Sequence, residues 1–189
     1  GALASNSTGS YNTAIGGSAL GANTTASNNT AVGYQAAYTG TTASGIAAFG
    51  YRSLYLNTAN NNTAFGSDTL SANTTGTQNT TIGKNALTSN IDGNYNSAVG
   101  LNALYSNTSG TSNTALGTYA LTSNTTASNN VAVGFQAGYN NTTGTLNTAI
   151  GYQTFYSNTT GGYNTAIGAN ALASNTTGSY NNAFGTQDN

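Results

Sequence analysis

The side chains able to do acid, base or metal chemistry are few and scattered. The chain has 189 residues, with no His, no Cys and no Glu. Its carboxylates are Asp68, Asp92 and Asp188, which fall in different parts of an internal repeat. General acid–base pairs, nucleophile triads and metal clusters all need partners that are missing here. The sequence therefore predicts a protein that is not an enzyme and that holds no cofactor and no metal.

Positive charge is just as sparse. Arg52 and Lys84 are the only basic residues, and the formal net charge is -1. Gly83-Lys84 lacks the earlier glycine and the following helix of a phosphate loop, so neither nucleotide nor nucleic-acid binding is expected. No run of eighteen apolar residues and no signal peptide are present, which predicts no membrane insertion. The chain starts at Gly1 within a repeat, and we expect it to be a piece of a longer or processed protein.

What the chain does contain is a short repeat marked by glycine. Successive marker glycines are 17 residues apart, except that Gly50 to Gly66 spans 16. The marker glycines are Gly16, Gly33, Gly50, Gly66, Gly83, Gly100, Gly117, Gly134, Gly151, Gly168 and Gly185. A fixed short period predicts stacked units that bury their apolar faces against their neighbours. We therefore interpret residues 1–189 as one repeat domain, irregular near residues 40–62.

Two further columns run beside the glycines. The apolar column immediately before them is a candidate core ladder: Ile15, Val32, Phe49, Phe65, Ile82, Val99, Leu116, Val133, Ile150, Ile167 and Phe184. Four residues before the glycine stands an asparagine ladder: Asn12, Asn29, Asn62, Asn79, Asn96, Asn113, Asn130, Asn147, Asn164 and Asn181. Ile46 is the one departure from it, and Gly40 replaces another recurring Asn in the same coil.

Each coil is expected to form two short strands. One covers Asn-Thr-Ala-Ile-Gly and the other Gln-Ala-Leu-Tyr, with a tight turn at the marker glycine and a polar arc such as 157–161 closing the coil. Alternation along the first strand places Thr and Ile on one face and Ala on the other. With Ala inside, the roll is thin and the Ile column needs cover from another chain. The pattern thus predicts an all-β parallel β-solenoid, a β-roll of about eleven coils, that forms an oligomer.

The phrase Asn-Thr-Ala-Ile-Gly at 147–151 also resembles a known repeat. It is similar to the Asn-Ser-x-Ala-Ile-Gly repeat in the YadA-like heads of trimeric autotransporter adhesins. The longer phrase over 147–161 resembles repeats of phage-type tail-fibre proteins that carry a C-terminal intramolecular chaperone domain. The resemblance implies a left-handed homotrimer that serves attachment. It also implies that the Ile column faces the trimer or roll core, that the Asn ladder is buried or caps turns, and that the marker glycines allow a sharp turn.

Two columns of tyrosine raise a binding hypothesis. They are Tyr38, Tyr55, Tyr105, Tyr139 and Tyr156, and Tyr11, Tyr95, Tyr163 and Tyr180. Aromatic rings on a sheet face can stack on sugars, which suits a fibre that binds a host-surface glycan. The competing interpretation is that the rings pack against the next coil or chain.

The polar arcs raise two more hypotheses. Eight asparagines that share one turn position of the repeat open Asn-x-Ser/Thr sequons and are candidate glycosylation sites: Asn6, Asn23, Asn73, Asn107, Asn124, Asn141, Asn158 and Asn175. The competing interpretation is that these asparagines form turns, and O-linked sugar on neighbouring Thr is an alternative. Paired threonines, as at Thr24-Thr25, suggest a hydroxyl array like that of ice-binding solenoids, although adjacent strand residues point opposite ways.

Together these features predict the shaft of an extracellular fibre, located on a cell surface or virion. Its partners would be copies of itself and a host-surface glycan or protein receptor. The alternative is a self-assembling extracellular filament whose subunits stack end to end, and ice binding is a minor alternative.

Overall fold

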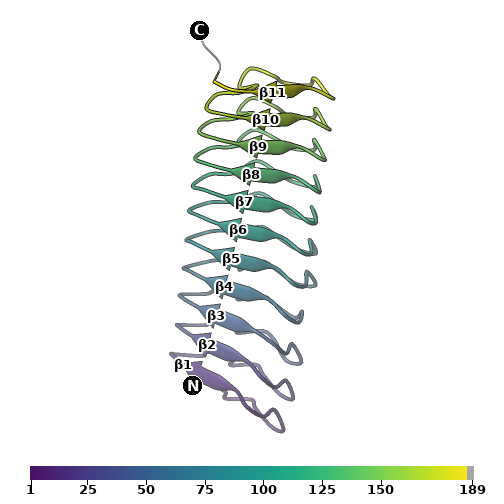
Figure 1. Ribbon diagram of the computed structural model, residues 1–189. Coiled ribbons are helices and arrows are strands. Elements are labelled where there is room, and N and C mark those ends of the chain that lie inside the picture. Colours follow the sequence, from purple (N-terminus) through teal and green to yellow (C-terminus); the bar gives the residue numbers. More distant parts are fainter. Residues whose placement is uncertain (187–189) are drawn as a thin grey trace.

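The computed structural model describes residues 1–186 and shows a parallel β-solenoid (Figure 1). Each coil contributes one strand, and all strands pair in parallel with their neighbours in chain order. The strands are β1 (Thr13–Ile15), β2 (Thr30–Val32), β3 (Ala47–Phe49), β4 (Thr63–Phe65), β5 (Thr80–Ile82), β6 (Ser97–Val99), β7 (Thr114–Leu116), β8 (Val131–Val133), β9 (Thr148–Ile150), β10 (Thr165–Ile167) and β11 (Asn182–Phe184). The all-β parallel solenoid predicted from the repeat is confirmed.

The register follows the repeat period residue by residue. Ala98 of β6 pairs with Ala115 of β7, and the flanking residues pair Ser97 with Thr114 and Val99 with Leu116. Residues at equivalent positions of the repeat therefore form ladders along the rod, because each one pairs with its equivalent in the neighbouring coil. The period read from the sequence is thus the distance along the chain between hydrogen-bonded partners.

The second predicted strand, over Gln-Ala-Leu-Tyr, is wrong. This segment is a run of turns, since its Gln and Leu positions have left-handed φ, as in Gln35 (54°) and Leu54 (53°). Such φ values are incompatible with an extended strand. The segment still bonds to the next coil: the Leu20 N–H donates to the Ala36 carbonyl at 2.9 Å. Inter-coil hydrogen bonds therefore continue around the coil beyond the strand.

The core is a thin layer between the strand and this turn segment. Alanine occupies the middle of most strands and is buried, as in Ala98 and Ala132 at 0% exposure. Opposite the strands lies a column of large buried side chains: Leu20, Leu54, Leu70, Leu87, Leu104, Leu121 and Phe155. Small residues on one side allow the coil to close tightly, which matches the flat roll expected from alanine inside.

The expected core ladder lies outside the chain's own core. Ile82 and Leu116 are 46% and 47% exposed, and no member of the column is buried. The column comprises Ile15, Val32, Phe49, Phe65, Ile82, Val99, Leu116, Val133, Ile150, Ile167 and Phe184. Since alternate residues of a strand point to opposite faces, burial of the central alanine turns both neighbours outward. Of the two places that the resemblance implied for this column, the roll core is excluded by its exposure, while cover by another chain stays a prediction.

The marker glycines do more than turn the chain. Their φ angles lie between 111° at Gly185 and 142° at Gly117, a region that residues with a side chain avoid. A Cβ at Gly117 would also overlap the carbonyl group of Gly134 in the next coil. Glycine is thus required both by backbone conformation and by the close approach of successive coils.

Three other columns hold left-handed φ without relying on glycine. Leu146 belongs to the exposed one, with φ of 59°, and Asn129 occupies its equivalent in the preceding coil with φ of 61°. Left-handed φ costs an ordinary residue roughly 1–2 kcal/mol, and Asn tolerates it better. The repeated hydrogen bonds between coils hold these residues in place.

Replacing Leu146 by asparagine is therefore expected to stabilise the fold. Because the side chain is 44% exposed, little packing is lost. The gain should be about 0.5–1 kcal/mol in the free energy of unfolding, measured by urea denaturation. A lower urea midpoint would show instead that the leucine makes contacts worth more than the strain.

Candidate functional site

Asparagine side chains form two continuous ladders inside the rod. The strand ladder is the predicted set: Asn12, Asn29, Asn62, Asn79, Asn96, Asn113, Asn130, Asn147, Asn164 and Asn181. Within it, the Asn113 Nδ2 donates to the Ala127 carbonyl at 2.8 Å, and its Oδ1 accepts the Asn130 backbone N–H at 3.0 Å. The members from Asn29 to Asn164 are at most 3% exposed. These amides therefore link each strand to the arcs of the neighbouring coils.

The arc ladder is a second set of asparagines, and the sequon pattern includes only part of it. Its members are Asn6, Asn23, Asn57, Asn73, Asn90, Asn107, Asn124, Asn141, Asn158 and Asn175. The Asn107 Nδ2 donates to Asn90 Oδ1 at 2.9 Å and to the Gly110 carbonyl at 3.1 Å. Asn57 and Asn90 begin no sequon yet occupy the same column. The repeat spacing, rather than the sequon, is the signal that identifies this ladder.

Burial contradicts N-glycosylation at most of the predicted sequons. Six of the asparagines are at most 1% exposed and use their Nδ2 in the arc ladder: Asn23, Asn73, Asn107, Asn124, Asn141 and Asn158. A glycan on that nitrogen would have no space and would disrupt its hydrogen bonds to the asparagine of the preceding coil and to the carbonyl of its own arc. Asn6 is exposed and Asn175 is half-buried, and these two residues lie in coils near the two ends of the described stack.

Both ladders are interrupted in one coil. Gly40 replaces the arc asparagine and Ile46 replaces the strand asparagine, and Asn23 Oδ1 is consequently buried without a hydrogen-bond partner. In the next coil the two ladders touch, since the Asn62 Nδ2 donates to Asn57 Oδ1 at 3.0 Å. The missing side chain at Gly40 thus leaves room for the larger Ile46, which is 3% exposed.

The 16-residue interval arises in the arc that follows this coil. Asn57 donates to the carbonyl two residues later, at Ala59, whereas other arcs use the carbonyl three residues later. One arc residue is therefore absent, and the pairing of β3 with β4 keeps its register.

Restoring both asparagines together should stabilise this coil. Gly40→Asn with Ile46→Asn would give Asn23 Oδ1 its donor and should raise the free energy of unfolding by about 1–2 kcal/mol. Gly40→Asn alone should destabilise, because the new side chain would meet Ile46, which is buried where the other coils carry the strand asparagine. Urea unfolding of both single variants and the double variant measures the coupling. Additive effects would contradict this account of compensating volumes.

The tyrosines mostly stack on the next coil. Tyr38 and Tyr55 are parallel with centroids 5.6 Å apart, and Tyr139 and Tyr156 are 5.2 Å apart. Tyr163 and Tyr180 of the second column also stack, at 4.9 Å. A stacked ring has one face covered by its neighbour, and Arg52 lies over the Tyr55 ring at 4.3 Å. Packing between coils, the simpler interpretation, accounts for these pairs.

The few charged groups are not assembled into a chemical site. No group of three potential metal-ligating residues occurs among residues 1–186, and Asp188 lies outside the described residues. No helix in that part of the chain is long and apolar enough for a transmembrane span.

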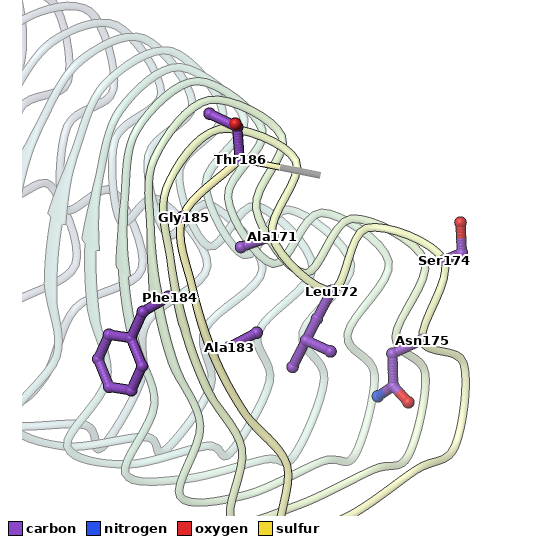
Figure 2. Close-up of a pocket in the computed structure, with 8 residues that line it drawn as sticks. All are labelled: Ala171, Leu172, Ser174, Asn175, Ala183, Phe184, Gly185 and Thr186. Carbon is purple, nitrogen blue, oxygen red and sulfur yellow. The ribbon is translucent and has the colours of Figure 1, made fainter. Parts of the chain in front are cut away.

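A hollow of about 440 Å³ lies at the β11 end of the stack. Figure 2 shows the residues that line it. Leu172, Ala183 and Ala171 line it, and these residues belong to the columns that form the core elsewhere. The hollow is therefore the place where a further coil would continue the core, and its lining offers no acid or base.

The remaining candidate is the outward face of the sheet. The Ile column runs along it from Ile15 to Phe184, and Phe49 and Phe65 stack within the column at 4.4 Å. One residue beyond each marker glycine, several more apolar side chains are exposed: Tyr34, Tyr51, Leu101, Phe135 and Tyr152. We call these two columns the apolar face. It is much longer than the isolated apolar patches that monomeric proteins tolerate, which is typical of an interaction surface.

Comparison with known proteins adds no further assignment: no family model matches the chain, and neither a curated protein nor a solved structure shows significant similarity to it.

Proposed function

We propose that this chain is a structural shaft of an extracellular fibre used for attachment, assembled as a homotrimer through the apolar face. The observation that carries the proposal is the Ile column, whose members are all exposed or half-buried along the described rod. An in-register ladder is complementary to a second copy of itself, because both copies repeat with the same spacing. The resemblance to the repeats of trimeric adhesin heads and tail fibres supports three chains and a role in attachment.

The outward orientation explains how association would stabilise the rod. Covering one Ile or Leu is worth roughly 1.5–3 kcal/mol, and the column supplies one such side chain per coil. Charge is sparse on this face, since only 3% of the residues are charged and the exposed Lys84 is the one charged residue in its two columns. A receptor for the fibre, whether a glycan or a protein, would be bound by the shaft or by parts of a longer protein.

A pair of charges in the apolar face should separate the copies. We expect the double variant Ile82→Lys with Leu116→Lys to weaken association at least 100-fold, because a buried unpaired lysine costs several kcal/mol. Sedimentation velocity measures the chain number and circular dichroism checks the fold. The matched control, Thr75→Lys with Thr126→Lys, adds the same charge on exposed arcs and should leave assembly unchanged. A wild-type monomer, or a face variant that still assembles, would contradict the proposal.

A second candidate is a filament whose subunits stack end to end. The observation that favours it is the open core beside Leu172 and Ala183, which a coil from another copy could continue (Figure 2). The β11 strand also has an unpaired edge among the described residues. Electron microscopy separates the candidates, because the Ile82→Lys, Leu116→Lys variant should abolish lateral trimers and leave end-to-end filaments intact.

A further inference from the structure

Two hydroxyl residues follow the arc asparagine in every coil except those of Asn57 and Asn90, and the two have different environments. The inner one, directly after the asparagine, donates its hydroxyl to a backbone carbonyl of the next coil. Thr125 Oγ1 reaches the Thr142 carbonyl at 3.1 Å, and Thr142 Oγ1 reaches the Thr159 carbonyl at 2.9 Å. This hydroxyl therefore belongs to the hydrogen-bond network that holds the stack together.

The outer hydroxyl residue points away from the rod. We define the outer arc column as Thr8, Thr25, Thr42, Thr75, Ser109, Thr126, Thr143, Thr160 and Thr177, with Asp92 in the remaining position. Every member is exposed, and none of these hydroxyls has a hydrogen-bond partner among residues 1–186. The paired-threonine array suggested for ice binding is thus reduced to one free column in a turn.

This column is more uniform than the fold requires. Another fully exposed column, which includes Asn129 and Leu146, holds six residue types: Tyr, Asn, Gly, Gln, Ser and Leu. In the outer arc column, nine of the ten residues carry a hydroxyl although it makes no hydrogen bond within residues 1–186. Turns favour Gly, Asn, Asp and Ser over Thr, so turn chemistry does not select threonine. Comparison between coils therefore indicates that something outside this chain uses the hydroxyl.

We infer that the outer arc threonines are sites of O-linked glycosylation, with the sugars forming a ladder along one edge of the rod. The threonine Oγ1 would attack the anomeric carbon of a sugar activated as a diphosphate ester. The bond from that carbon to the diphosphate breaks, the diphosphate leaves with the electron pair, and a base of the transferase takes the hydroxyl proton. Successive sugars would lie about 4.8 Å apart, the spacing of stacked strands.

The placement of this column is compatible with both solubility and assembly. Only 3% of the residues are charged, and attached sugar solvates a surface that lacks charge. The arc closes each coil at the end opposite the marker glycine, whereas the apolar face flanks that glycine. Sugars on the arcs would leave the apolar face free, and the inference does not depend on the number of chains.

Peptide mapping of the protein isolated from its source tests the inference. Chymotrypsin cleavage after Tyr156 and Tyr163 releases residues 157–163, which contain one arc with Asn158, Thr159 and Thr160. Electron-transfer fragmentation should place sugar on Thr160 and leave Asn158 and Thr159 bare. Sugar on Asn158 or Thr159, or a whole-protein mass equal to that of the bare polypeptide, would overturn the inference.

A pair of neighbouring variants made in the source organism provides the matched control. Thr160→Val should remove the sugar from this arc and leave the unfolding temperature of the deglycosylated protein unchanged. Thr159→Val should keep the sugar and lower that temperature, since Thr159 Oγ1 donates to the Thr176 carbonyl at 3.1 Å. Loss of the sugar in both variants would show that a sequence motif, rather than the exposed hydroxyl, determines the site.

Discussion

Replacing Asn130 by leucine is expected to destabilise the protein by about 2–4 kcal/mol. The buried Asn147 N–H, which donates to Asn130 Oδ1, loses its partner at a cost of about 1–3 kcal/mol. The Gly144 carbonyl loses the hydrogen bond from Asn130 Nδ2 at about 0.5–1.5 kcal/mol and keeps the one from Asn141 Nδ2. Asn130 itself is only 1% exposed, so water does not replace these bonds. Urea unfolding followed by circular dichroism gives the change in the free energy of unfolding.

The neighbouring residue supplies the control. Asn129 is exposed, and Leu146 already occupies its column one coil later. The same substitution there, Asn129→Leu, should cost about 1 kcal/mol or less, mainly from left-handed φ. Equal losses from the two variants would show that the strand ladder contributes nothing beyond the general intolerance of the coil to leucine.

Replacing Gly117 by alanine should be at least as damaging, by about 4 kcal/mol or more. The residue has φ of 142°, and the added Cβ would overlap the carbonyl group of Gly134. Conformational strain accounts for about 1–3 kcal/mol and overpacking for a similar amount. Because the added Cβ would clash with backbone atoms of Gly134, a change of side-chain rotamer cannot relieve the overlap. Thermal unfolding should show a large loss of stability or no folded protein.

A second glycine in the middle of the stack serves as a control, because it separates the clash with the next coil from the general cost of replacing a glycine by alanine. Gly138 has φ of 61°, and its Cβ would meet the flexible Leu121 side chain at 2.9 Å. Its column already contains Ala37 with φ of 49°. Gly138→Ala should therefore change stability by about 1 kcal/mol or less. A severe loss at Gly138, or tolerance at Gly117, would refute the account of close coil stacking.

The repeat period predicted the solenoid because it is also the register of the parallel strands. The second strand could not be rejected from residue types, since leucine and glutamine rarely adopt left-handed φ. Residues such as Leu87 hold it here because inter-coil hydrogen bonds on both sides determine their conformation. Conformation at these positions is a property of the stack and has no signature in one coil.

The candidate sites show the same limit. Alternation along Thr-Ala-Ile correctly placed alanine inside the roll. The large apolar side chains of the Ile column also suggested a role in a core. Which core they could join is decided by their burial, which only the three-dimensional structure gives. Sequons depend on residue identity alone, and they could not reveal that Asn107 is buried while Ser109 is exposed. Comparing columns between coils would have found Asn57 and Asn90 in the arc ladder from the sequence.

The measurement that most directly tests the proposed assembly is cryo-electron microscopy of the fibre isolated from its source. We predict three chains around one axis, with the column from Ile15 to Phe184 covered by the neighbouring copies. A single chain whose Ile column faces solvent along the rod would contradict the proposal.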